Sequence, residues 1–98
     1  MITTNAIVKV RPEKKEEFLQ AMHSLQNDKM KEKGIRGSKM HEDPDRTGFR
    51  IVDEWESEED LNRYCQSESY RVFLGALITL CTEAEVKVGA VSIRHPVM

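Results

Sequence analysis

The stretch from residue 49 to residue 80 constrains the fold more than any other, because it predicts a strand followed at once by two capped helices. Phe49 to Trp55 is rich in strand-forming residues and ends in a large aromatic side chain. Ser57 then precedes three acids, a pattern typical of a helix start at which the serine hydroxyl accepts a backbone N–H. Ser67 can cap a second helix. Its apolar stripe, at helical spacing, comprises Tyr70, Phe73, Leu74, Leu77 and Cys81.

The rest of the chain supplies the other elements of a ferredoxin-like α+β fold. We expect strands over residues 2–10, 35–42 and 84–93, and a helix from Pro12 to about Lys33. The turn at residues 43–48 makes the second and third strands a hairpin, and Gly37 weakens or bulges the second. The order is strand, helix, strand, strand, helix pair, strand. It predicts a four-stranded antiparallel sheet with helices on one face.

The uncovered face of such a sheet predicts a partner. Either Ile51 and Trp55 or the residues next to them, whose side chains point to the opposite face of the strand, would otherwise form an apolar patch in water. A second copy that lays its own sheet against this face covers the patch most simply. We therefore expect a homodimer in which the two sheets form an α+β barrel.

Composition narrows the class of protein. The 98 residues predict a single domain over residues 1–98, and 15 basic against 17 acidic side chains give no basic excess for nucleic acid. No apolar run approaches the roughly 20 residues that span a membrane.

Cys65 and Cys81 are too few for a disulfide scaffold, so we expect buried thiols in a cytoplasmic protein. His23, His41 and His95 lack metal-ligand spacing, so we expect no metal site.

The segments Asp53–Leu61 and Ser67–Phe73 resemble the signature of the antibiotic biosynthesis monooxygenase superfamily, and length and element order agree over nearly the whole chain. The resemblance implies a dimeric α+β barrel. Activities known in the superfamily include cofactor-free oxygenation of phenols or quinols, haem degradation, and isomerisation of a bacterial signalling molecule. On this ground we expect a cofactor-independent monooxygenase that acts on a small aromatic substrate.

The haem-degrading branch of the superfamily uses an Asn on the first strand, a Trp on the first paired helix and a His on the second. Asn5 fits the first role, but Tyr64 and Leu74 stand where the other two would be. Without that imidazole the chain has no evident iron ligand, so we expect no haem and no other cofactor. The family also often carries a His where this chain has Tyr64, and a second near Ser69.

The candidate site lies in the space expected between sheet and helices. Asn5 and Tyr64 are the candidate catalytic residues, as hydrogen-bond donors to a substrate oxygen. Asp53 and Glu54 point to opposite faces of their strand, and the one nearer the interior would suit a general base. The candidate substrate-binding residues are Glu54, Tyr70, Phe73 and Leu77. Each of these residues also has a plainer interpretation. The Asn5 amide would simply be hydrogen-bonded to backbone or water, the aromatic side chains would pack in the core, and Asp53 and Glu54 would be surface carboxylates.

Two other functions stay open. A non-catalytic ligand-binding or assembly module of the same fold is favoured by the missing histidines. An isomerase of a phosphorylated signal would need cations near the pocket, for which Arg50, Arg63 and Arg71 are available. The charge run from Lys29 to Lys33 predicts only a solvated helix face.

Overall fold

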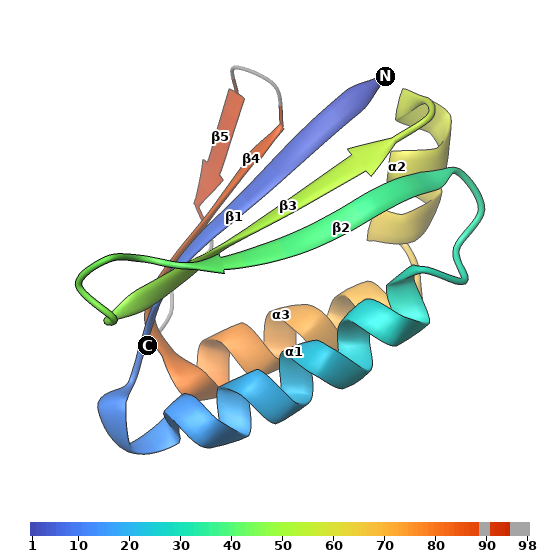
Figure 1. Ribbon diagram of the computed structural model, residues 1–98. Helices are drawn as coiled ribbons and strands as arrows, with labels where there is room; N and C mark the ends of the chain where they lie inside the picture. Colours follow the sequence, from blue (N-terminus) through green and yellow to red (C-terminus); the bar gives the residue numbers. More distant parts are fainter. Residues whose placement is uncertain (89–90, 95–98) are drawn as a thin grey trace.

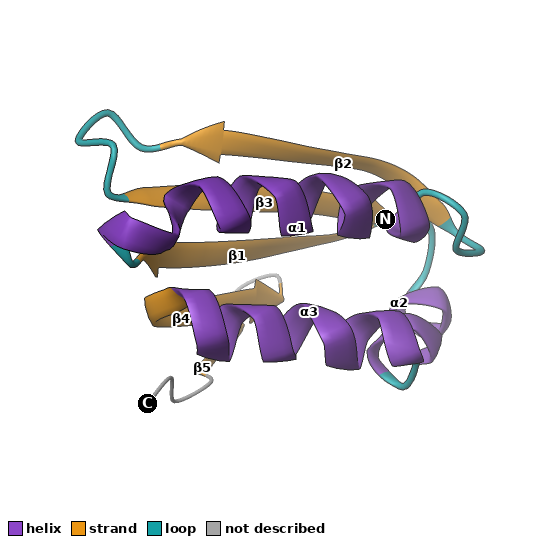
Figure 2. Ribbon diagram, turned by 90° about the horizontal axis from the view of Figure 1, so that it is seen from below, coloured by secondary structure: helices purple, strands orange, loops and turns teal. Residues whose placement is uncertain are grey.

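The structure is a computed structural model that describes residues 1–88 and the backbone of residues 91–94. Helices α1 and α3 lie side by side beneath one face of a twisted sheet, and α2 lies at one end of the sheet, beyond the end of β3 (Figure 1 and Figure 2). The elements are β1 (Ile2–Val10), the 3₁₀ turn η1 (Pro12–Lys14), α1 (Lys15–Lys29), β2 (Ile35–Glu42), β3 (Gly48–Trp55), α2 (Glu58–Cys65), α3 (Glu68–Leu80), β4 (Cys81–Val88) and β5 (Val91–Arg94).

The sheet confirms the ferredoxin-like arrangement and adds one strand to it. Its order is β2-β3-β1-β4-β5, and every neighbouring pair is antiparallel. The expectation of one last strand over residues 84–93 is wrong. β4 begins at Cys81, directly after α3, and β5 folds back to pair with it from Glu85↔Arg94 to Val88↔Val91. His95 and the rest of the tail lie outside the described residues.

Helix α1 ends at Lys29, so the expected end near Lys33 is wrong by about one turn. The chain then makes tight turns and reaches Gly34, whose φ of 89° is one that side chains other than glycine rarely adopt. A Cβ atom at Gly34 would overlap the side chain of Asp60 at the start of α2. Glu56 N donates to Gly34 O at 2.8 Å. Gly34 thus lies in the turn after the helix, beyond its C-cap Met30, and its missing side chain lets α2 pack against that turn.

Both serine caps are confirmed. Ser57 Oγ accepts from Asp60 N at 3.2 Å, and Ser67 Oγ accepts from Tyr70 N at 3.2 Å. Ser67 Oγ also donates to Tyr64 O at 2.6 Å. The two hydroxyls fix where α2 begins and where α3 takes over from it.

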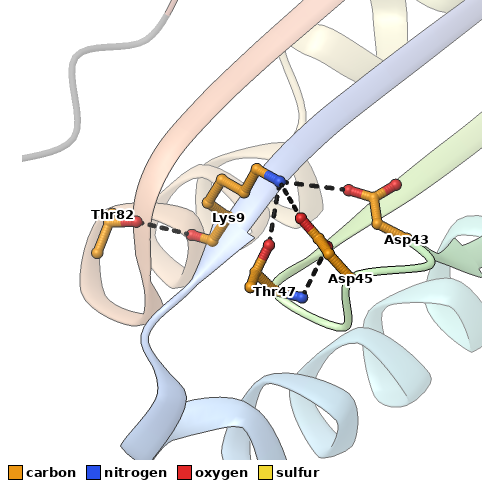
Figure 3. A network of polar contacts seen from close by, with 5 residues as sticks. All are labelled: Lys9, Asp43, Asp45, Thr47 and Thr82. Carbon is orange, nitrogen blue, oxygen red and sulfur yellow. Dashed lines mark hydrogen bonds and ion pairs between the residues drawn. The ribbon is translucent and has the colours of Figure 1, made fainter.

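A lysine on β1 ties down the turn between β2 and β3 (Figure 3). Lys9 Nζ donates to Thr47 Oγ1 at 3.1 Å and lies 3.7 Å from Asp43 Oδ2 and 3.4 Å from Asp45 Oδ2. Arg46, at φ 61°, is the turn residue with positive φ. The expected hairpin is therefore present, and the bulge at Gly37 appears as a register shift between Ile35 and Gly37.

The core lies between the helices and the sheet, and strand alternation decides what faces it. Ile51 and Trp55 on β3 are both buried under the helices. Their neighbours Arg50, Val52 and Glu54 therefore lie on the uncovered face. Of the two alternatives left open for the uncovered face, the structure therefore selects the neighbours of Ile51 and Trp55, of which only Val52 is apolar. The main apolar core comprises Ala6, Val8, Val10, Phe18, Met22, Phe49, Ile51, Phe73, Leu77, Leu80, Cys81 and Val86.

Candidate functional site

A buried ion pair joins α1 to the sheet at one end of the core. Lys29, the last residue of α1, places Nζ 2.8 Å from Oδ2 of Asp53 on β3. Only 2% of Lys29 and 7% of Asp53 is exposed. Charges are rarely buried this fully without a partner or a function, because desolvation removes most of what their mutual attraction gains. The pair is therefore the most unusual chemistry in the described part of the chain.

Aromatic rings surround this pair. Lys29 Nζ lies 5.2 Å from the ring centroid of Phe73 and 5.8 Å from that of Tyr64, within cation–π range. Tyr64 stacks on Trp55 with centroids 5.0 Å apart, and Tyr70 meets Tyr64 edge-on at 5.3 Å. The lysine ammonium thus has a carboxylate on one side and rings on others. We call Lys29, Asp53, Trp55, Tyr64, Tyr70 and Phe73 the aromatic ion-pair site.

The aromatic ion-pair site contains two buried polar atoms without hydrogen-bond partners among the residues that the structure describes. They are Asp53 Oδ1, an acceptor, and Trp55 Nε1, a donor. Asp53 and Trp55 are two residues apart on one face of β3, so their side chains project to the same side. An unsatisfied buried polar atom costs on the order of 1–3 kcal/mol. A ligand that brought one donor and one acceptor would recover that cost.

The phenols of the site are held in their neutral form. Burial, together with the negative charge of Asp53, raises the pKa of Tyr64 well above its ordinary value. Burial also raises the pKa of Tyr70. Both hydroxyls are therefore protonated at neutral pH and can donate, but they do not act as bases. The free carboxylate oxygen of Asp53 is the proton acceptor that the site offers.

The structure brings some of the sequence-predicted residues together and separates others. Tyr64, Tyr70 and Phe73 belong to the aromatic ion-pair site, and Leu77 lies in the adjoining apolar core. Asn5 and Glu54 lie on the uncovered face of the sheet, where Asn5 pairs with Val52. Placing Asn5 or Glu54 in a pocket under the helices is therefore wrong. The alternation of β1 and β3, which buries Thr4, Ala6, Asp53 and Trp55, is the reason.

Two charged residues carry the site, and sequence reasoning identifies only one of them. Asp53 is the interior member of the Asp53/Glu54 pair, between which the sequence does not decide. The charge run predicts a solvated Lys29, and the burial of Lys29 contradicts that prediction. A signal is present, because Phe18, Met22, Leu25 and Lys29 follow one another at helical spacing. Lys29 therefore continues the buried stripe of α1.

The arginines considered for a phosphate site do not converge. Arg50 is exposed on the uncovered face of the sheet, and Arg71 pairs with Glu68 on the outside of α3 at 3.8 Å. Arg63 Nη1 binds Asp60 Oδ1 at 2.8 Å. Arg63 lines a polar pocket of about 320 Å³ whose other lining residues are Lys33, Gly34, Glu56, Ser57, Glu59 and Asp60. This pocket holds more acids than bases, so it does not suit a phosphate group.

The remaining chemistry is plain. Cys81 is buried but Cys65 is exposed, so the expectation that both thiols are buried is wrong for Cys65. Within residues 1–88 and 91–94, no three side chains of His, Cys, Asp or Glu group together as metal ligands would. In the same ranges no helix has the length and apolar character needed to cross a membrane.

Fold and site together define a ferredoxin-like α+β domain with a polar centre buried among aromatic rings. The family model for antibiotic biosynthesis monooxygenase matches residues 1–76, and the chain belongs to this family. A comparison with curated proteins found no match.

Solved structures of low sequence identity share the fold. A conserved protein from Methanosarcina mazei Go1 is 24% identical, with a TM-score of 0.83 over 89% of this chain and 88% of that one. Rv0793 from Mycobacterium tuberculosis is 19% identical, with a TM-score of 0.83 over 92% of this chain and 93% of that one. A protein described as an antibiotic biosynthesis monooxygenase is 16% identical, with a TM-score of 0.82 over 93% and 98%.

Proposed function

We propose that the protein is a cofactor-independent monooxygenase whose substrate, a small phenol or quinol, binds at the aromatic ion-pair site. The observation that carries the proposal is Asp53 Oδ1, a buried carboxylate oxygen that lacks a partner among the described residues and belongs to a lysine-paired side chain. Family membership supports an oxygenase or small-molecule-binding role and leaves the substrate open. The rings of Tyr64, Tyr70 and Phe73 supply the flat apolar walls that an aromatic substrate needs.

The residues of the site suit a reaction in which the substrate itself reduces oxygen. Asp53 Oδ1 accepts the phenolic proton, and the Lys29 ammonium stabilises the resulting phenolate. The electron-rich ring then reacts with O₂. A ring C–H becomes C=O with one oxygen atom of O₂, and the phenolate C–O becomes the second C=O. The other oxygen atom leaves as water with the displaced ring hydrogen and the proton held by Asp53. The ring gives up all four electrons, so no external reductant is required.

Entry to the site involves the eight-residue helix α2, which carries Tyr64 across the buried Trp55. The helix lies between two serine caps, Ser57 and Ser67, at which the chain changes direction. Tyr70, half-buried beside Tyr64, lies on the outer side of the cluster. We propose that movement of α2 and Tyr70 admits the substrate.

Oxygen uptake tests the proposal. The protein is incubated with anthrones and hydroquinones in air, without added cofactor, and uptake is recorded with an electrode. Lys29→Met and Asp53→Asn should each lower kcat by roughly 10²-fold or more, the range typical of a lost general base or electrostatic stabiliser. Lys31→Met and Asp28→Asn, both exposed on or next to α1, are the matched controls and should retain activity. No uptake above buffer with any substrate would contradict the proposal.

A second candidate is a non-catalytic module that binds a small ligand. It is favoured by the composition of the aromatic ion-pair site, whose six residues include no histidine, the side chain used most often as a general acid or base. This candidate predicts that phenols bind but consume no oxygen. Calorimetric binding and the electrode assay on one preparation therefore separate the two.

We also propose that the protein works as a homodimer in the cytoplasm. Ile7 and Val52, half-buried on neighbouring strands of the uncovered sheet face, support a contact there, and the family's fold is often dimeric. The two free cysteines fit a reducing compartment. Val52→Asp should shift the sedimentation coefficient from that of a dimer to that of a monomer. A wild-type protein that sediments as a monomer at micromolar concentration would contradict the dimer.

A further inference from the structure

We infer that the aromatic ion-pair site selects aromatic molecules that carry no net charge, and that Lys29 and Asp53 set this selectivity through their charge balance. The inference rests on the proposed binding of an aromatic molecule at this site, and it does not require turnover. It names the class of ligand as neutral hydroxy-aromatics, in preference to aromatic acids or amines.

The charges of the site already cancel. Lys29 Nζ and Asp53 Oδ2 are 2.8 Å apart, and both side chains are almost completely buried. A carboxylate or ammonium on the ligand would add an uncompensated charge to a region with little water, which is costly to desolvate. A neutral phenol adds none. The half-buried Glu32, whose negative charge also reaches Tyr64, disfavours an anion further.

The unpaired atoms of the site match a neutral hydroxyl. Asp53 Oδ1 accepts only, so it needs a donor from the ligand, and a phenolic O–H provides one. Trp55 Nε1 donates only, so it needs an acceptor such as a carbonyl or a second hydroxyl oxygen. A ligand carboxylate would face Asp53 Oδ1 with a like charge. A ligand ammonium would compete with Lys29 for the same carboxylate.

Changing one member of the pair should change the preferred charge of the ligand. Asp53→Asn removes the negative charge, so the remaining Lys29 ammonium should favour an aromatic carboxylate. Lys29→Met leaves the Asp53 carboxylate, which should favour an aromatic ammonium. The double variant, which carries both substitutions, is again neutral and should again prefer a phenol.

The experiment is calorimetric titration at pH 7 under argon, with ligands that share one ring system. The probes are 1-naphthol, 1-naphthoate and 1-naphthylmethylammonium. For the wild-type protein we expect 1-naphthol to bind roughly tenfold or more tightly than either charged probe, a difference that calorimetry resolves easily. Asp53→Asn should reverse the order of 1-naphthol and 1-naphthoate. Asp28→Asn, a change of the same type at an exposed position, should leave the order unchanged.

The wild-type comparison needs no variant, so the inference can fail even if a substitution prevents folding. Equal or tighter binding of 1-naphthoate by the wild type would overturn it, and so would failure of every probe to bind. Selective binding of 1-naphthol by a protein that consumes no oxygen would uphold the inference while contradicting the proposed monooxygenase. Failure of the proposed monooxygenase is therefore distinguishable from failure of the charge selectivity.

Discussion

The ammonium of Lys29 reaches the carboxylate of Asp53 across 2.8 Å and so ties the end of α1 to β3. Neither partner can reach bulk water, because Lys29 is 2% exposed and Asp53 7% exposed. Each charge therefore depends on the other for its solvation. Removing either one leaves the other buried and unpaired.

Lys29→Met and Asp53→Asn should each lower the free energy of unfolding by about 3–5 kcal/mol, the cost typical of breaking a buried ion pair. The double variant should lose much less than the sum of the two, because it leaves no unpaired charge. Urea unfolding followed by circular dichroism measures this. Lys31→Met, at an exposed position, is the control. Additive losses would show that the two charges are not coupled.

Gly34→Ala should be strongly destabilising. Gly34 has a φ of 89°, and a Cβ atom there would overlap the carboxyl group of Asp60. The backbone strain alone costs about 1–2 kcal/mol, and the overlap adds to it. The same urea experiment detects the loss. A Gly34→Ala variant as stable as the wild type would mean that α2 does not pack against this turn.

Gly75→Ala is the opposite case and a matched control for Gly34→Ala. Gly75 lies inside α3, and a Cβ atom there would meet nothing within 4 Å. Alanine should raise the free energy of unfolding by roughly 0.5–1 kcal/mol, because glycine in a helix interior loses more backbone entropy on folding. A loss of stability in the Gly75→Ala variant would indicate that α3 packs on that side against something.

Ser57→Ala should lower the free energy of unfolding by about 1 kcal/mol, since Ser57 Oγ accepts from Asp60 N at the start of α2. Ser24→Ala is the control, because Ser24 is exposed in the middle of α1 and caps nothing. Hydrogen exchange should show the loss of protection confined to α2. Equal effects of the two substitutions would rule out the cap as a source of stability.

Stability should fall as the pH rises above about 9. Burial raises the pKa of the Cys81 thiol from its ordinary value of 9.0 to about 11. Between these values the unfolded chain has lost a proton that the folded chain keeps, so folding weakens by up to about 1.4 kcal/mol per pH unit for this thiol. Urea unfolding between pH 8 and pH 10.5 measures the slope. Cys81→Ala should make the decline shallower, and an unchanged slope would contradict the assignment.

The sequence is sufficient to predict most of the fold, because its local signals and its periodicity agree. Ser57 and Ser67 mark helix starts through chemistry that acts within a few residues. The last two strands, β4 and β5, are not predictable in this way. Residues 84–93 have the composition of a single strand, and only the hydrogen-bonded pairing of β4 with β5 shows that there are two.

The candidate site is harder to predict, because strand phase and long-range contacts decide it. Sequence reasoning puts Asn5 on the wrong face and does not decide between Asp53 and Glu54, since a strand with apolar residues on both faces does not reveal which face the helices cover. Lys29 resembles any other residue of a charged run until its partner 24 positions away is known. The aromatic residues Tyr64, Tyr70 and Phe73 need only helical spacing, and the sequence identifies them.

Trp55 is the sole tryptophan of the chain, fully buried against Tyr64 and next but one to Asp53. Its fluorescence therefore reports on one place only, the neighbourhood of the charged pair. Folding, ligand occupancy and any shift of α2 should each alter the wavelength or the intensity of that emission. The protein thus has a built-in optical probe where its chemistry is proposed to occur, and no label has to be attached.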